Sequence, residues 1–330
     1  MKRLSDTVLA KLQADMQVPD LSGTRYNVLG YLDRGGMGSV WLAEDTVLKR
    51  RVALKVLDLV ATTDDLAARL FQEARILAAL EHPGIVPVHD AGTLADGRAF
   101  YCMKYVEGET LVQYIADKSL PERLRLLQRI AEPLDFAHAR HFNHRDLKPE
   151  NVMVGSFGEV LAMDWGLATV RATALKPPGN EVPPTMQPGI PSRVTGQGSI
   201  LGTPGYMSPE QASGNGEVDH RTDVFSLGAI LLFLLSGSGP RELPLADSSA
   251  PRPLRAICGK ATAADPAARY QSAREMTADI AHYLNGEPVR AYPEGLLERA
   301  GRMYSRHRTA IVLVAVYLFI RVLFILLARR

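Results

Sequence analysis

The sequence predicts an α+β fold of two lobes, a β-rich lobe followed by an α-rich lobe, with one apolar helix near the C-terminal end. Strand-like runs separated by turns fill residues 23–107, helical patterns dominate 108–286, and 309–328 is almost wholly apolar. We therefore divide the chain into a leader (1–22), a two-lobed domain (23–286), a basic segment (287–308) and a transmembrane helix (309–328).

Length and charge narrow the classes of protein. With 330 residues the chain can bury a sizeable core, as two domains or as one domain with two lobes. Its formal net charge of +2 creates no whole-molecule field, so we expect no nucleic-acid partner. The two cysteines, Cys102 and Cys258, lie in apolar surroundings and are expected to be reduced and buried.

The β-rich lobe is predicted from short runs of apolar residues between turns. The expected strands are 26–32, 40–43, 52–57, 85–88 and 100–103. An apolar stripe with helical spacing predicts a helix over 64–80, which His82-Pro83-Gly84 would end.

The α-rich lobe follows a junction at about Lys104–Gly108 and is predicted from helical spacing of apolar residues. The expected helices are 111–117, 121–140, 219–235, 254–261 and 273–284. Residues 171–194 are rich in proline and glycine, so we expect a mobile loop there with no structure of its own.

The apolar segment 309–328 is long enough to cross a bilayer as a helix. Its Ile, Val, Leu and Phe residues favour insertion by roughly 4–8 kcal/mol, and Arg321 opposes insertion by at most about 3 kcal/mol. This predicts a single-pass protein of the inner cell membrane with a cytoplasmic domain; an amphipathic or core helix interrupted by Arg321 is the alternative. Four arginines precede the segment and would hold that side in the cytoplasm: Arg299, Arg302, Arg306 and Arg308.

A run of charged and amide side chains in the α-rich lobe carries the chemistry. His144-Arg145-Asp146-Leu147-Lys148-Pro149-Glu150-Asn151 is followed by Asp-Trp-Gly beginning at Asp164. Asp146 can accept a hydrogen bond and then a proton from a hydroxyl, and Lys148 can neutralise a phosphate oxygen. Asn151 and Asp164 offer hard oxygen ligands to Mg²⁺. In-line transfer of a phosphoryl group from ATP to a hydroxyl requires this set of groups.

These motifs resemble the catalytic and metal-binding loops of bacterial eukaryotic-like (Hanks-type) serine/threonine protein kinases. The resemblance covers about residues 25–285 and implies the two-lobe protein kinase fold, ATP as the nucleotide, and Mg²⁺ or Mn²⁺ as the metal. Lys55 resembles the family's lysine beside the α- and β-phosphates, and Glu73 resembles its partner on the following helix.

The same resemblance implies a nucleotide-binding set. Residues 32–40 resemble the glycine-rich loop, where a Cβ would block close approach of the backbone to phosphate oxygens; Asp33 replaces the first glycine and is expected to face solvent. Met103 resembles the residue behind adenine, and the hinge after it supplies backbone hydrogen bonds although Lys104 departs from the usual Glu. The full set is Leu32, Asp33, Arg34, Gly35, Gly36, Met37, Gly38, Ser39, Val40, Ala53, Lys55, Met103, Tyr105 and Val106.

Within the resemblance, Lys148 and Thr203 match kinases that phosphorylate serine and threonine in proteins. Glu210 is expected to form a buried ion pair with Arg269, and Asp223 to brace the catalytic loop from a buried helix. These three residues have structural roles.

Regulation is also implied by the resemblance. Arg145 precedes the catalytic aspartate and needs an anion, which in the family is a phosphorylated residue of the activation segment. Thr195 and Ser199 are the candidate phosphosites, with Thr195 first, and a homodimer would allow one copy to phosphorylate the other.

Two other classes of protein remain open. Asp33 and the short stretch between Leu235 and Leu254 favour a pseudokinase or scaffold that binds nucleotide without turnover. A membrane-tethered interaction protein without enzymatic activity is the third class. Phosphate transfer from labelled ATP distinguishes the enzyme from both.

Overall fold

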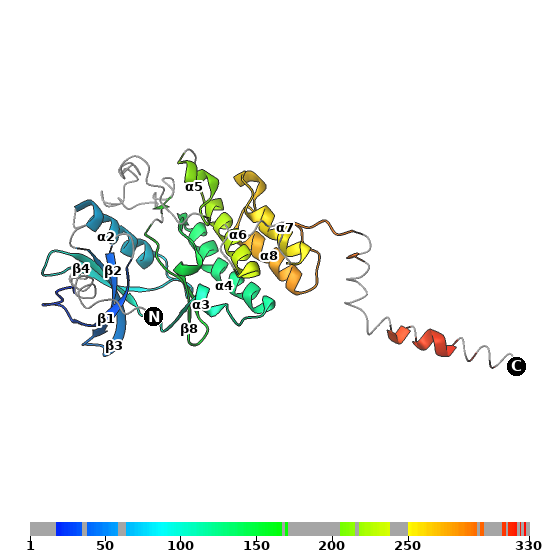
Figure 1. Ribbon diagram of the computed structural model, residues 1–330, viewed down its shortest axis with the longest axis horizontal. Coiled ribbons are helices and arrows are strands. Elements are labelled where there is room, and N and C mark those ends of the chain that lie inside the picture. Colours follow the sequence, from blue (N-terminus) through cyan, green and yellow to red (C-terminus); the bar gives the residue numbers. More distant parts are fainter. Residues whose placement is uncertain are drawn as a thin grey trace, which may run out of the picture.

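The computed structural model describes residues 18–34, 38–58, 64–166, 169–170, 205–214, 218–237, 250–295 and 298–299, and also 312–314, 316–321, 324 and 327. The predicted two-lobe α+β architecture is present: the strands of the first lobe lie at one end of the molecule and the helices of the second lie beside them (Figure 1).

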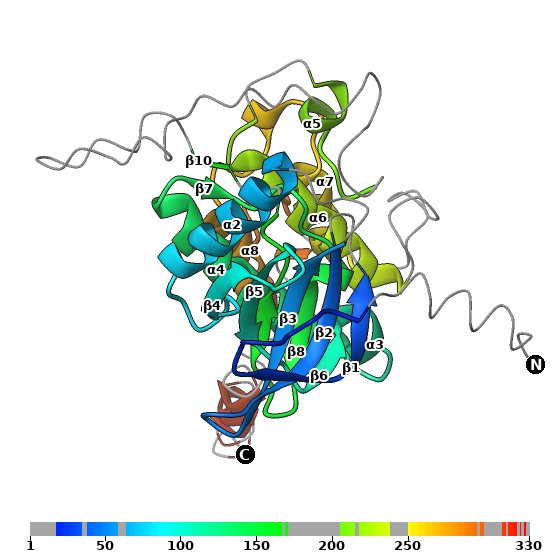
Figure 2. The ribbon, with the colours of Figure 1, turned by 90° about the vertical axis from the view of Figure 1, so that its left-hand side faces the viewer.

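Five antiparallel strands form the sheet of the first lobe in the order β1-β2-β3-β5-β4. They are β1 (Tyr26–Arg34), β2 (Gly38–Asp45), β3 (Arg50–Leu57), β4 (Val88–Thr93) and β5 (Ala99–Lys104). The helix α2 (Asp64–Ala79) contacts β3, β4 and β5 and lies beside the sheet in Figure 2. One face of the sheet is therefore covered by this helix and by the second lobe.

The central strand β3 is buried on both faces, which determines where its lysine points. Residues Val52–Leu57 are all buried, and successive side chains of a strand alternate between faces. Val52, Leu54 and Val56 join an apolar cluster on the outer face. Lys55 therefore projects to the opposite face, toward α2 and the second lobe.

The predicted strand at 85–88 is wrong for residues 85–87. β4 begins at Val88, and Ile85 forms only an isolated bridge with Ala162 of the second lobe. Ile85 and Val86 are buried because they pass between the lobes, not because they belong to the sheet. Pro87 lacks the N–H that a strand residue donates.

The second lobe is mainly helical. Its helices are α3 (Leu111–Tyr114), α4 (Leu120–Ala139), α5 (Pro209–Ser213), α6 (Arg221–Ser236), α7 (Arg252–Ala261) and α8 (Ala273–Leu284), with 3₁₀ turns at Pro149–Asn151 and Pro266–Ala268. A capping contact explains where α4 begins. The backbone N–H of Ser119, which precedes the helix, donates to the Glu122 carboxylate at 2.8 Å. The predicted bounds agree for α8 and differ by up to three residues for α3, α4, α6 and α7, whereas α5 was not predicted.

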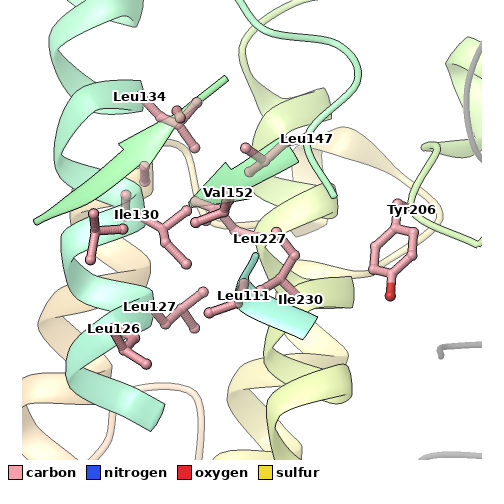
Figure 3. Close-up of a cluster of buried hydrophobic side chains, with 14 of the residues drawn as sticks. Leu111, Leu126, Leu127, Ile130, Leu134, Leu147, Val152, Tyr206, Leu227 and Ile230 are labelled. Atoms are coloured by element: carbon pink, nitrogen blue, oxygen red, sulfur yellow. The ribbon is translucent and has the colours of Figure 1, made fainter. Parts of the chain in front are cut away.

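The core of this lobe lies between α4 and α6. Figure 3 shows Leu127 and Ile130 of α4 facing Leu227 and Ile230 of α6, with Val152 between them. All five side chains are at most 1% exposed. Burying a side chain to this extent contributes about 2 kcal/mol to the free energy of unfolding.

Five short strands of the second lobe were not predicted. β6 (Gly108–Thr110), β8 (Val152–Gly155) and β9 (Val160–Ala162) form one antiparallel sheet, and β7 (Phe142–Asn143) pairs with β10 (Thr169–Val170). Strands of two to four residues are too short for an alternating pattern to be recognised.

The chain after α8 remains packed on the second lobe. The buried carboxylate of Asp279 accepts hydrogen bonds from the Tyr270 hydroxyl (2.8 Å) and from the backbone N–H groups of Arg290 (2.9 Å) and Ala291 (3.0 Å). Val289 is buried in the same place. Asp279 thus anchors this segment through its backbone.

Further along, residues 312–314 and 316–321 are helical and their apolar side chains are exposed. Within the residues that the structure describes, no helix meets the length and hydropathy needed to cross a bilayer. The described part of the predicted span 309–328 lies apart from the two lobes at the far end of the molecule (Figure 1).

Candidate active site

Lys55 lies at the meeting point of the two lobes, between two carboxylates. Its Nζ donates to Glu73 Oε1 at 2.8 Å and Oε2 at 3.0 Å, and to Asp164 Oδ1 at 2.8 Å. Glu73 comes from α2 and Asp164 from the segment after β9, so one ammonium group joins both lobes. Lys55 and Glu73 are 6% and 1% exposed.

The electrostatics of this group favour its charged state. Burial alone would lower the pKa of Lys55, but Tyr101 and the two carboxylates outweigh burial and hold the pKa well above its ordinary value. Burial raises the pKa of Asp164, but Lys55 outweighs it, so the pKa lies below its ordinary value. Burial raises the pKa of Glu73, and Lys55 opposes that rise without cancelling it.

The hairpin of β8 and β9 brings the two predicted metal ligands together. Val152 pairs with Ala162, so the residues just before β8 and just after β9 are neighbours. Accordingly, the N–H of Met163 donates to the carbonyl of Asn151 at 2.8 Å. Asn151 and Asp164 are therefore placed at the same end of one hairpin, although 13 residues separate them in the sequence.

Asp146 is held beside these residues by the 3₁₀ turn that follows it. Asn151 Nδ2 donates to the Asp146 carbonyl at 2.8 Å and to Asp146 Oδ2 at 3.2 Å. Lys148 Nζ lies 3.3 Å from the same Oδ2. A base, a cation and an amide thus converge within one loop.

Asp223, on α6, braces the loop from beneath as predicted. Its carboxylate is fully buried and accepts from the backbone N–H groups of His144 and Arg145, both at 2.8 Å. His138 Nε2 is 2.7 Å from the same carboxylate. Although burial raises the pKa of Asp223, these partners, His138 first, lower it below the ordinary value.

Two residues of the site have backbones in the left-handed region, Arg145 with φ 67° and Asp164 with φ 55°. Such positions are uncommon for residues other than glycine and are sustained by surrounding contacts. Asp223 binds the N–H of Arg145, and Lys55 binds the side chain of Asp164. The strain therefore lies where the loop must present its functional groups.

The residues present fit a magnesium ion. The Asn151 amide donates through Nδ2, so its oxygen is left to accept or ligate, and Asp164 supplies a half-exposed carboxylate with a lowered pKa. No group of three or more His, Cys, Asp or Glu side chains among the described residues could hold a metal. Mg²⁺ usually binds through one or two protein oxygens together with substrate phosphates and water.

The predicted adenine-side residues lie on β2, β3, β5 and the segment after β5. Ala53, Met103 and Val106 are buried, Val40 and Tyr105 are partly buried, and Ala53 pairs with Met103 across the sheet. Lys104 does not point into the core: its Nζ lies 3.6 Å from Glu159.

The glycine-rich segment is described at its two ends. Leu32, Asp33 and Arg34 are exposed, as expected for Asp33, whose carboxylate accepts from the N–H of Arg34 at 2.8 Å. Gly35, Gly36 and Met37 lie outside the described residues. Ser39 is buried and donates through Oγ to Asp58 at 2.6 Å.

A glycine is required at position 38 for a further reason, which the sequence did not indicate. A Cβ there would meet the carbonyl oxygen of Val56 at 2.2 Å. The close approach that demands glycine is therefore to the neighbouring strand β3, whatever the backbone does toward a phosphate.

The predicted ion pair at the base of the second lobe forms in bidentate geometry. Arg269 Nη1 and Nη2 each donate to the carboxylate of Glu210 at 2.7 Å, and Arg269 is 2% exposed. Its remaining N–H groups donate to backbone carbonyls, including that of Ala263 at 2.7 Å. This guanidinium thus connects Glu210 of α5 with the backbone that follows α7.

Some predicted residues lie outside the described part of the chain. These are Thr195, Ser199 and Thr203, the loop 171–194, and most of the stretch between Leu235 and Leu254.

One residue of the site was missed at the sequence level. Tyr101 on β5 is buried and its hydroxyl donates to Glu73 Oε1 at 2.8 Å. The alternation of side chains along a strand could have indicated this residue, because Tyr101 stands two residues before Met103 and so faces the same side of the sheet.

A two-lobed fold with a Lys–Glu–Asp junction and an Asp–Lys–Asn loop has the groups that phosphoryl transfer from ATP requires and is typical of the kinase class. Comparison with known proteins identifies the family. Residues 26–280 match the family model described as the protein kinase domain, and the chain belongs to that family.

Curated relatives agree. The chain is 33% identical over 297 residues to the serine/threonine-protein kinase PknD of Chlamydia pneumoniae, covering 80% of this chain and 31% of that protein. It is 34% identical over 278 residues to the serine/threonine-protein kinase PrkC of Bacillus subtilis, covering 78% of this chain and 40% of that protein. The chain thus spans about a third of the length of these relatives.

A solved structure agrees as well. The kinase domain of PknI from Mycobacterium tuberculosis is 28% identical, with a TM-score of 0.60, and the alignment covers 82% of this chain and 99% of that domain. The likeness extends over both lobes.

Proposed function

We propose that this chain is an ATP-dependent serine/threonine protein kinase that transfers the γ-phosphoryl group to hydroxyls of protein substrates. The observation that carries the proposal is the convergence of two groups of residues on one hairpin. Asn151 contacts Asp146, and Asp164 contacts Lys55, at the same end of β8 and β9.

Each residue has a role that follows from its position. Asp146 orients the acceptor hydroxyl and takes its proton, and Lys148 neutralises a phosphate oxygen beside it. Lys55, fixed by Glu73, holds the α- and β-phosphates. Asn151 and Asp164 would hold Mg²⁺, which when bound neutralises charge on the transferred group.

The proposal is tested by incubating the purified full chain with γ-labelled ATP, Mg²⁺ and casein. Label is expected on serine and threonine of casein and of the chain itself, and chelation of the metal should abolish it. Asp146→Ala serves as the control for contaminating kinases. Nucleotide binding without label in the wild type would favour the scaffold, and equal label in both proteins would refute the assignment.

Self-activation is part of the proposal. Arg145 lies in the catalytic loop, and its Nε is buried without a hydrogen-bond partner among the described residues. A guanidinium with a buried nitrogen that lacks a hydrogen-bond partner favours binding of a phosphate group. We place that phosphate on Thr195 or Ser199, added by a second copy of the chain. Digestion of the labelled protein should therefore yield a labelled peptide containing one of them.

We also propose that the segment 309–328 anchors the chain in the inner membrane, with the kinase lobes in the cytoplasm. The exposed apolar side chains of its described helical residues support this, because water solvates such a surface poorly. The full chain is expected to remain in the membrane pellet after an alkaline wash, and a chain ending at residue 300 is expected in the supernatant. Release of the full chain by the wash would contradict the anchor.

A further inference from the structure

The helix α2 carries a glutamate with two different donors on one oxygen atom. Glu73 Oε1 accepts from Lys55 Nζ at 2.8 Å and from the Tyr101 hydroxyl at 2.8 Å. Tyr101 is 1% exposed and comes from β5, the strand that also carries Met103 of the predicted nucleotide-binding set.

The sheet register places this tyrosine beside the lysine. Lys55 and Tyr101 are partners across β3 and β5, and both project to the face that α2 covers. Lys55 Nζ also lies 5.8 Å from the centre of the Tyr101 ring, within reach of a cation–π attraction. The tyrosine therefore contacts both members of the Lys55–Glu73 pair.

We propose that Tyr101 is a positioning residue for phosphoryl transfer: its hydroxyl holds Glu73 against Lys55, and so holds α2 in the arrangement that catalysis requires. The inference rests on the proposed kinase function. It goes beyond the Lys–Glu pair because it adds a third member that fixes the glutamate from the sheet.

The physical reason lies in the burial of Glu73. A buried carboxylate with a single lysine partner keeps part of its hydrogen-bonding capacity unused, and such a group is costly in the interior. Two donors on Oε1, together with the contact of Lys55 to Oε2, define the rotamer of the side chain.

The test is Tyr101→Phe, which removes one oxygen atom and keeps the ring. We expect kcat/KM for ATP to fall about tenfold, the size expected for one hydrogen bond to a buried carboxylate.

Tyr270→Phe is the matched control. Tyr270 is 2% exposed and donates to the buried carboxylate of Asp279 at 2.8 Å, but in the second lobe, away from the site. The substitution Tyr270→Phe removes the same kind of bond, so it should lower thermal stability to a similar extent but leave kcat/KM for ATP within twofold of the wild type.

A double-mutant cycle identifies the route of the effect. In a Glu73→Ala background, Tyr101→Phe should change the residual kcat/KM less than twofold, because the group it positions is gone. An undiminished loss in that background, or a Tyr101→Phe enzyme within twofold of the wild type, would overturn the proposal.

Hydrogen exchange provides a readout that needs no turnover. Amides of α2 should exchange faster in Tyr101→Phe than in the wild type or in Tyr270→Phe. Unchanged exchange in α2 would overturn the positioning role even in active enzyme. A wild-type chain that transfers no phosphate would instead reject the kinase function, while the exchange data would still decide whether Tyr101 holds the helix.

Discussion

Asp146→Asn is expected to lower kcat by about 10²- to 10⁴-fold, the range for losing a general base. The substitution keeps the size of the side chain, and its amide oxygen can still accept from Asn151 and Lys148, whose nitrogen atoms lie 3.2 and 3.3 Å from Oδ2 of Asp146. The amide cannot take the proton of the acceptor hydroxyl. The KM for ATP should change little, since the nucleotide phosphates are assigned to Lys55 and the metal.

Initial rates at saturating ATP and protein substrate measure this effect. Glu150→Gln is the matched control, since Glu150 is an exposed carboxylate in the same loop. The control should keep near wild-type activity. An Asp146→Asn enzyme within tenfold of the wild type would show that Asp146 is not the base.

Arg269→Met is expected to destabilise the protein by about 3 kcal/mol, because it removes a buried guanidinium and leaves the partly buried carboxylate of Glu210 without its cation. The guanidinium also donates to backbone carbonyls around residue 263, which would lose their partners. Urea unfolding measures the change. Arg69→Met removes an exposed i,i+4 pair with Asp65 and should change stability by about 1 kcal/mol or less.

The pH dependence of that pair has a definite sign. Burial raises the pKa of Glu210, but Arg269 outweighs burial and holds the pKa below the ordinary value of 4.5. A lowered folded-state pKa contributes stability that is complete above the unfolded value and is lost as the pH falls through the folded one. The difference between wild type and Arg269→Met should therefore persist at neutral pH and shrink below about pH 4.5. A difference that grows on acidification would contradict this pairing.

The proximity of the proposed catalytic residues could be predicted because they lie in one short motif. Asp146, Lys148 and Asn151 are held in one loop, so their spacing in sequence almost determines their spacing in space. Glu210 and Arg269 are 59 residues apart, and only the resemblance to a family connected them.

The predictions that failed concern segments whose structure depends on contacts with distant parts of the chain. Ile85 and Val86 are apolar like a strand, but they are buried by the second lobe. β8 and β9 are too short for a pattern, although they align Asn151 with Asp164. Gly38 stays a predicted phosphate-binding residue, and only the structure shows that a Cβ there would also meet the carbonyl oxygen of Val56.

The amino-acid sequence by itself determined the two-lobe plan and the loop that groups Asp146, Lys148 and Asn151, because hydrophobic periodicity and local motifs act over a few residues. Only the tertiary structure showed that Tyr101 and Asp164 join the Lys55–Glu73 pair. The hydroxyl of Tyr101, the carboxylates of Glu73 and Asp164 and the ammonium of Lys55 come from four separate segments. Their meeting depends on strand register and on the docking of α2, and both are set by long-range packing.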